Sequence, residues 1–175
     1  MNTQRIKFID TYIDNLTASE AKECVNEVIR KPGYHYVVTP NADIIVKMHQ
    51  DRELKDICEK ADLILTDGQI VVKLSRRYGT AIKERVCMTD FVWDVFDLAI
   101  EKEYKIFLLG GKEEILSKAT ENVKKKLPKL NIVDSYSPPF GFEKDKKALA
   151  ETNERIRNSH ADILIVFLGC PKQEK

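Results

Sequence analysis

The chain has 175 residues, of which 43% are hydrophobic and 33% charged, so it can bury the core of one ordinary domain but hardly of two. Lys and Arg number 29 and Asp and Glu number 28, for a formal net charge of +1. This balance excludes a global attraction to nucleic acid, so any anionic partner must meet a local site.

The N-terminal residues MNTQRIKFIDTYID contain no apolar signal segment. The cysteines, at positions 24, 58, 87 and 170, form no CxxC pair. Both features predict a cytoplasmic protein with reduced thiols. The longest apolar run, residues 163–168, is too short to span a bilayer, so any membrane contact is expected from outside.

Strand-like and helix-like stretches alternate along the first part of the chain. Residues 5–14 alternate between apolar and polar positions, as in one or two short edge strands. Thr17 and Glu20 have the spacing of a capping box, which predicts a helix to about Lys31. The next expected elements are a strand at 34–38, a helix starting at Asn41 or Asp43, a helix at 52–60, a strand at 62–66, a helix at 69–77, and an apolar helix at 91–103 capped by Thr89.

The same alternation continues to the end of the chain. The expected elements are a strand at 105–109, an amphipathic helix carrying Ile115, Ala119, Val123 and Leu127, a strand at 131–135, a loop SPPFGF, a helix at 143–159 and a strand at 162–168. Uninterrupted apolar strands alternating with helices indicate a parallel sheet covered on both faces, joined by right-handed crossovers. The sequence therefore predicts an α/β fold with a Rossmann-like, doubly wound, mostly parallel sheet and helices on both faces.

In such folds ligands bind at the carboxyl ends of the strands, near a switch point in strand order. Polar or glycine-rich segments follow every expected buried strand, which places them along one rim. These segments are Thr39-Pro40-Asn41-Ala42-Asp43, Asp67-Gly68-Gln69, Gly110-Gly111-Lys112, YSPPFGF, and Gly169-Cys170-Pro171-Lys172-Gln173.

Each segment also has an ordinary structural interpretation. Thr39, Asn41 and Asp67 all precede helices and are common N-cap residues. Gly110-Gly111 lacks the third glycine of the dinucleotide fingerprint, although two glycines still let a phosphate approach a helix N-terminus. Arg85 lies in a connection with little expected structure and could reach the rim to meet an anion.

Six stretches occur in the order VVTPNADIIVK, ADLILTDGQIVV, ERV before TDF, FLLGGKEE, SPPFGF and ADILIVFLGCPKQEK. This ordered set resembles the WecG/TagA/CpsF family of bacterial glycosyltransferases over nearly the whole chain. The resemblance is strongest to the members that build the linkage unit of wall teichoic acid.

The resemblance implies an inverting transfer of N-acetylmannosamine from a UDP-sugar donor to undecaprenyl-diphosphate-linked N-acetylglucosamine. It implies a peripheral location at the cytoplasmic face of the plasma membrane and no cofactor. It also implies no metal, in line with the lack of a DxD triplet where one would be expected and the lack of ligand spacing among His35, His49 and His160.

The resemblance also implies roles for the rim residues. Asp67 is expected as the base that takes the proton of the acceptor hydroxyl, with Thr39 and Arg85 as further catalytic residues. Glycine amides and cations are expected to stabilise the departing UDP. The expected substrate-binding residues are Asn41, Gln69, Gly110, Gly111, Lys112, Glu113, Phe140, Gly141, Gly169, Lys172 and Gln173.

Family members continue well past the GCPKQE motif, whereas this chain stops at Lys175. We therefore expect a single catalytic domain, residues 1–175, that lacks the family's C-terminal portion and binds donor poorly. The alternatives are a non-catalytic nucleotide-binding module and a family member that transfers another hexose. An NAD-dependent oxidoreductase is disfavoured by the incomplete glycine fingerprint. The oligomeric state is open, with a homo-oligomer among the alternatives.

Overall fold

The computed structural model describes residues 5–175 as a mixed α/β fold. Contacts divide the chain into two compact units, one ending at Val95 and rejoined by Glu174–Lys175, and the other spanning Phe96–Gln173. The division falls within helix α5 (Met88–Lys102). The predicted fold class, α/β with parallel strands, is confirmed.

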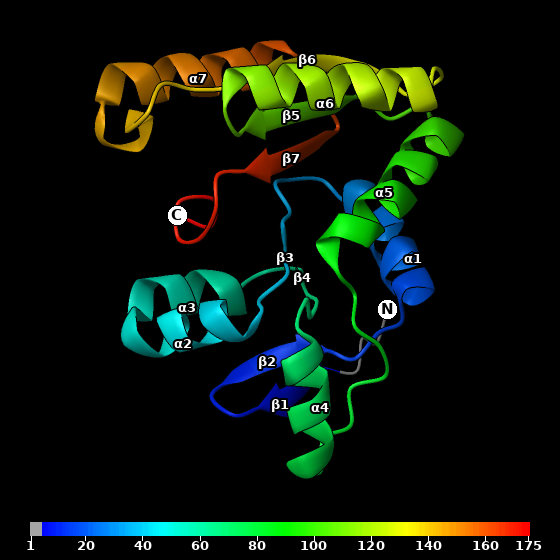
Figure 1. Ribbon diagram of the computed structural model, residues 1–175, viewed down its shortest axis with the longest axis vertical. Coiled ribbons are helices and arrows are strands. Elements are labelled where there is room, and N and C mark those ends of the chain that lie inside the picture. The colour runs from blue at the N-terminus through cyan, green and yellow to red at the C-terminus, as the bar shows by residue number, and fades with distance from the viewer. Residues whose placement is uncertain (1–4) are drawn as a thin grey trace. The chain divides into compact units, whose positions relative to one another are not determined.

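The first unit alternates short strands with helices (Figure 1). Its elements before α5 are β1 (Arg5–Phe8), β2 (Thr11–Asp14), α1 (Ala18–Ile29), β3 (Val37–Val38), α2 (Ala42–Gln50), α3 (Arg52–Glu59), β4 (Leu63–Ile64) and α4 (Gln69–Arg77). The predicted edge strands form an antiparallel hairpin, with Phe8 paired to Thr11. The capping box at Thr17 and Glu20 is confirmed.

The hairpin β1–β2 and helix α4 share one hydrophobic core. Phe8 and Ile13 of the hairpin pack with Val71 and Val72 of α4 and with Ile82. The Ser75 hydroxyl accepts the N–H of Ile82 at 3.0 Å, which ties α4 to the segment that follows it. One side of α4 is therefore held against the hairpin.

Strands β3 and β4 form a parallel pair that is shorter than predicted. Val38 pairs with Ile64, and the Leu65 N–H donates to the Val38 carbonyl at 2.8 Å. The Asp62 carboxylate accepts the Tyr36 N–H at 3.1 Å. The Tyr36 carbonyl still accepts the Asp62 N–H at 3.1 Å, so one backbone bond precedes the strand pair, and the Asp62 side chain satisfies the N–H of Tyr36 just before β3 begins at Val37.

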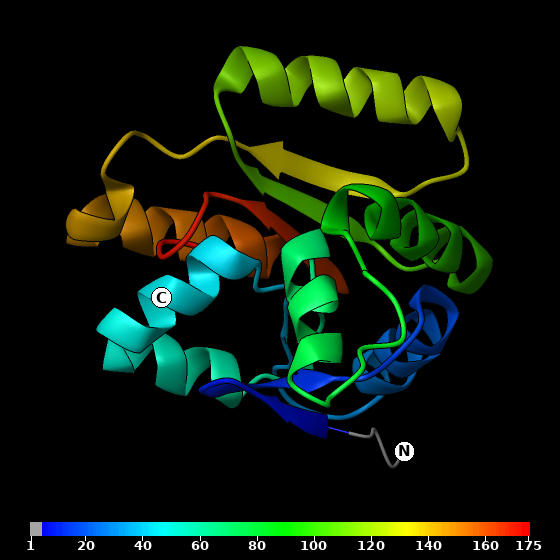
Figure 2. The ribbon, with the colours of Figure 1, turned by 60° about the horizontal axis from the view of Figure 1, so that its bottom comes forward.

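The second unit contains a three-stranded parallel sheet in the order β6-β5-β7. Its elements after α5 are β5 (Ile106–Gly110), α6 (Glu113–Lys126), β6 (Ile132–Tyr136), the 3-10 helix η1 (Phe142–Lys144), α7 (Lys146–Asn158) and β7 (Ile163–Phe167). The chain runs from β5 to β6 on one side and then to β7 on the other, so right-handed connections place α6 and α7 on opposite faces. Figure 2 shows the strands between these two helices. The strand order therefore reverses between the neighbouring strands β5 and β7, which makes this position a switch point.

Some predicted boundaries are wrong. Thr89 does not cap the apolar helix: α5 begins at Met88, and the Cys87 carbonyl accepts the Phe91 N–H at 2.8 Å. The helix expected at 143–159 begins only at Lys146, because the Asp145 carboxylate caps it by accepting the N–H of Lys147 at 2.9 Å. The segment before it is the separate turn η1.

Strand β7 is less buried than its apolar sequence predicts. Leu164 is 42% exposed and Phe167 is 46% exposed. These side chains are three residues apart and so lie on opposite faces of the strand, which means that neither face of β7 is fully covered. Among residues 5–175, none of the helices combines the length and the hydropathy needed to cross a bilayer.

Candidate functional site

The carboxyl ends of β3 and β4 bring together the first group of predicted site residues. Thr39 follows the last residue of β3, and Thr66-Asp67 follow β4 by two residues. The paired register of Val38 with Ile64 means that both segments leave the sheet at the same end. Thr39 and Asp67 are half-buried, and Thr66 is fully buried.

Asn41 and Asp67 were both candidates for N-cap residues, but only Asn41 caps a helix. The Asn41 side chain caps α2 by accepting the Ile44 N–H at 3.0 Å. The N-cap of α4 is instead Gly68, which provides no side-chain hydrogen bond. Within residues 5–175 the Asp67 carboxylate has no hydrogen-bonding or ion-pair partner. Capping is therefore the role of Asn41, whereas Asp67 does not cap α4.

The remaining predicted residues of the first unit lie at the start of α4 and in the connection that follows it. Gln69 is the exposed first residue of α4. Arg85 is half-buried and its Nη2 donates to Asp90 in the first turn of α5 at 3.3 Å. Its connection is better ordered than its sequence indicates, because Asn15 accepts the Lys83 N–H at 2.7 Å. The Arg85 guanidinium is thus anchored through its backbone neighbours and a carboxylate.

In the second unit, Gly110 and Gly111 lie at the switch point between β5 and β7. The Gly111 N–H donates to the Phe167 carbonyl at 3.1 Å, and the Ser137 hydroxyl donates to the Gly111 carbonyl at 2.6 Å. A Cβ at Gly110 would lie 2.8 Å from the Phe167 oxygen, whereas a Cβ at Gly111 would have no atom within 4 Å. Gly110 is therefore required by the close approach of β7, and Gly111 faces open space.

Lys112 and Glu113 follow at the N-terminus of α6, and both are exposed. Lys112 occupies the N-cap position without a side-chain hydrogen bond. Within residues 5–175 no side chain caps the N-terminus of α6, where the helix dipole favours an anion. Glu113 and Glu114 lie in the same turn and suit the dipole in the ordinary structural way.

The loop after β6 presents an aromatic ring beside a cation. Phe140 is fully exposed, and the Lys172 ammonium lies 4.9 Å from its ring centroid. Lys172 also pairs with Glu143 at 3.0 Å, and this contact lowers the pKa of the Glu143 carboxyl below its ordinary value. Gly141 has a φ of +81°, which turns the chain between Phe140 and η1.

The turn after β7 is closed by its own side chain. The Gln173 Oε1 accepts the Gly169 N–H at 3.1 Å, and Gly169 has a φ of +74°. Lys172 and Gln173, expected to contact substrate, are therefore both engaged within the protein. A ligand at this turn would meet groups that are already oriented.

Sequence reasoning missed three residues that support these groups. Ser137 and Glu143 contact Gly111 and Lys172 across long sequence separations that no local pattern signals. Thr66 is 2% exposed, and its hydroxyl has no hydrogen-bond partner within residues 5–175. Its place directly before Asp67 is the only sequence signal for it. No three His, Cys, Asp or Glu side chains of the described chain are grouped so that they could hold a metal ion.

Parallel strands joined by helices, with polar or glycine-rich segments at their carboxyl ends, define a Rossmann-like α/β protein. Residues 6–175 match the glycosyl transferase WecG/TagA/CpsF family. The chain belongs to this family, as the resemblance of its motifs predicted.

Two curated relatives carry the name N-acetylglucosaminyldiphosphoundecaprenol N-acetyl-beta-D-mannosaminyltransferase. The protein of Bacillus spizizenii (strain W23) is 28% identical over 174 residues, which cover 99% of this chain and 65% of the relative. The protein of Bacillus subtilis (strain 168) is 28% identical over 139 residues, which cover 79% of this chain and 52% of the relative. The chain thus spans less than two thirds of the length of these relatives.

Proposed function

We propose that this protein is a glycosyltransferase that moves N-acetylmannosamine from UDP-N-acetylmannosamine to undecaprenyl-diphosphate-linked N-acetylglucosamine. The family membership and the names of both relatives support this acceptor and this sugar. The transfer inverts the anomeric carbon and uses neither a metal nor a cofactor. The enzyme works at the cytoplasmic face of the membrane that holds its acceptor.

The observation that carries the proposal is the unengaged carboxylate of Asp67 at the end of β4. An inverting transfer is one in-line displacement, in which the acceptor hydroxyl attacks the anomeric carbon while UDP departs from the opposite side. A carboxylate must take the hydroxyl proton during the attack. Asp67 can do so because no described residue donates a hydrogen bond to it and the cap of α4 is Gly68.

The departing UDP requires hydrogen-bond donors and positive charge when no metal is used. In our proposal the second unit supplies them through the N-terminal N–H groups of α6, the open surface at Gly111 and the ammonium of Lys172. Phe140, Gly141, Gly169 and Gln173 shape the same end of the sheet. In our proposal the first unit contributes Asp67 as the base with Thr39 and Arg85 as further catalytic residues, and Asn41 and Gln69 bind substrate.

Asp67→Asn tests the proposal. We expect kcat to fall about 100- to 10,000-fold, the range of general acid–base catalysis, with UDP affinity unchanged. The matched control is Asp56→Asn, the same change at an exposed residue of α3, which should keep full activity. Transfer is measured as UDP release with lipid-linked N-acetylglucosamine as acceptor.

A panel of UDP-hexoses in the same assay tests the donor. N-acetylmannosamine is expected to give the highest kcat/KM. If the rate per folded Asp67→Asn enzyme is unchanged, Asp67 is not the general base. If the protein binds UDP but transfers no sugar, it is a non-catalytic nucleotide-binding module instead.

A further inference from the structure

Helix α4 exposes an apolar stripe that the site does not use. Ile70 is 61% exposed, Leu74 38% and Tyr78, the residue after the last of α4, 64%. The spacing of four residues places the three side chains along one side of the helix. The adjoining side of α4 is buried against the hairpin β1–β2. At the end of the stripe the exposed Tyr78 ring also meets Phe8 of the hairpin edge-on, with centroids 6.5 Å apart. The stripe is therefore presented by a helix that is firmly held.

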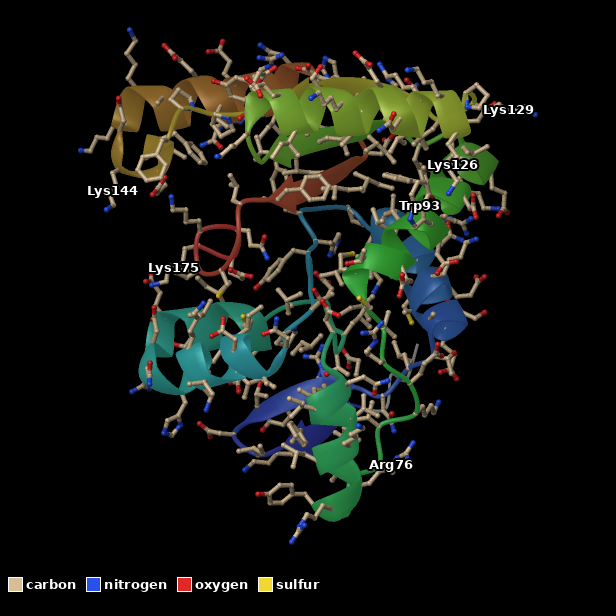
Figure 3. All side chains as sticks on the ribbon, viewed as in Figure 1. Arg76, Trp93, Lys126, Lys129, Lys144 and Lys175 are labelled. Carbon is tan, nitrogen blue, oxygen red and sulfur yellow. The ribbon has the colours of Figure 1, made fainter. Side chains whose placement is uncertain are left out.

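Cations lie beside the stripe, and α4 itself carries no acid to balance them. Lys73, Arg76 and Arg77 are exposed, and residues 69–78 contain no Asp or Glu. No described residue forms an ion pair with any of the three. Figure 3 shows Arg76 at the side of α4. The α4 surface is defined as Ile70, Lys73, Leu74, Arg76, Arg77 and Tyr78. At 100° per residue its cations lie on one side of the apolar stripe, and the buried residues of α4 lie on the other.

We propose that the α4 surface binds an anionic lipid bilayer, with α4 lying in the plane of the headgroups. A helix with exposed apolar side chains beside Lys and Arg is the type that binds at a membrane interface. The long stems of Lys and Arg let their charges reach lipid phosphates while Ile70 and Leu74 enter the acyl boundary. A tyrosine suits the interface because its ring is apolar and its hydroxyl is polar.

Charge favours lipid over a second copy of the chain as the occupant. A two-fold contact through α4 would bring identical cations together across the interface, with no acid of α4 to pair them. An anionic bilayer neutralises the same charges. The position of α4 adds a reason that rests on the proposed function: α4 begins two residues after Asp67, so a bilayer at this surface would lie beside the base for a lipid-linked acceptor.

Vesicle binding tests the proposal without donor or acceptor. The chain is sedimented with vesicles of phosphatidylcholine containing phosphatidylglycerol, and with phosphatidylcholine alone. We expect binding to the anionic vesicles that weakens with salt. Lys73→Gln/Arg76→Gln/Arg77→Gln should weaken it about 100-fold, since each basic residue near such a surface contributes about fivefold. Ile70→Gln/Leu74→Gln should weaken it about tenfold or more.

Matched controls lie on α6. Lys118→Gln/Lys124→Gln/Lys125→Gln removes the same charge from exposed positions, and Ile115→Gln removes an isoleucine that is 63% exposed. Both should bind vesicles like the parent chain, and circular dichroism should show all variants folded.

Three results would overturn the proposal. These are no binding of the parent chain to anionic vesicles, an equal loss in the α6 triple variant, and a dimer in gel filtration that Ile70→Gln/Leu74→Gln dissociates while vesicle binding stays unchanged. The last result would make the α4 surface a contact between copies. Failure of sugar transfer alone would not contradict the lipid-binding proposal, because the vesicles contain no substrate. Asp67→Asn should bind the vesicles like the parent chain.

Discussion

An alanine at Gly110 tests whether the close approach of β7 shapes the switch point. The Cβ would lie 2.8 Å from the Phe167 carbonyl oxygen and 2.9 Å from its carbon, both backbone atoms that cannot rotate away. The φ of Gly110 is +107°, which L side chains rarely adopt. Either β5 and β7 must separate or the backbone at Gly110 must change, so we expect the variant to lose stability.

Gly111→Ala is the matched control, because Gly111 also has a positive φ, +78°, but no atom within 4 Å of its Cβ position. The left-handed conformation costs an alanine about 1–2 kcal/mol, of which about 0.4–1 kcal/mol is offset by lower entropy of the unfolded chain. The expected net loss at Gly111 is therefore about 1 kcal/mol. Overpacking adds about 1–3 kcal/mol at Gly110, for a total of about 3 kcal/mol.

Urea unfolding followed by far-UV circular dichroism measures both losses, with one m-value fitted to all variants. Thermal unfolding provides a second measure, at about 2–4 °C per kcal/mol for a chain of this size. Equal losses at the two glycines would refute the reasoning, because they would show that the Phe167 backbone does not limit the side chain at Gly110. A smaller loss at Gly110 than at Gly111 would refute it more strongly.

Two further predictions concern carboxylates held by arginines. The Asp14 side chain is fully buried and accepts hydrogen bonds from Arg5 at 2.9 Å and from the Ile64 N–H at 2.8 Å. Asp14→Asn should therefore lower the free energy of unfolding by about 3 kcal/mol in urea, and a loss below about 1 kcal/mol would contradict this role. Arg155 donates to Asp134 at 2.7 Å and holds the pKa of that carboxyl below its ordinary value. The stabilisation is present above the unfolded pKa of about 3.9 and is lost as the pH falls through the lower folded pKa. The stability gap between the parent chain and Asp134→Asn should therefore narrow below about pH 4 in thermal melts, and a constant gap down to pH 2 would contradict it.

The parts of the fold that were predicted correctly depend on signals close in sequence. The capping box of α1 needs only Thr17 and Glu20, and the bounds of α4 follow from the strand before it and the loss of apolar periodicity after Arg77. Thr89 shows the limit of such signals, because a capping residue type does not decide which backbone carbonyl starts the helix. The start of α7 fails for the same reason, since Glu143 and Lys144 suit a helix as well as a 3-10 turn.

The sequence predicts where the candidate site residues lie, but it does not predict whether their side chains already have partners within the protein. Parallel strands determine that polar segments after β3 and β4 leave the sheet at one end, and the sequence shows which residues those are. It does not show whether their side chains are already satisfied. Lys172 is paired with Glu143, 29 positions earlier along the chain, and only the folded loop brings the two together.

The candidate residues differ in whether their side chains already have partners, and this difference decides which of them could act as a base. Asn41 caps α2, Arg85 donates to the Asp90 carboxylate, and Gln173 accepts the Gly169 N–H, so all three side chains are already engaged within the protein. A base must have lone pairs available to the substrate hydroxyl before the reaction begins. Asp67 meets that condition, and its neighbour Thr66 has a buried hydroxyl that also lacks a partner within residues 5–175. The buried Thr66 hydroxyl costs stability as long as it has no partner, whereas the half-buried Asp67 carboxylate keeps access to solvent, so its lone pairs are available without that cost.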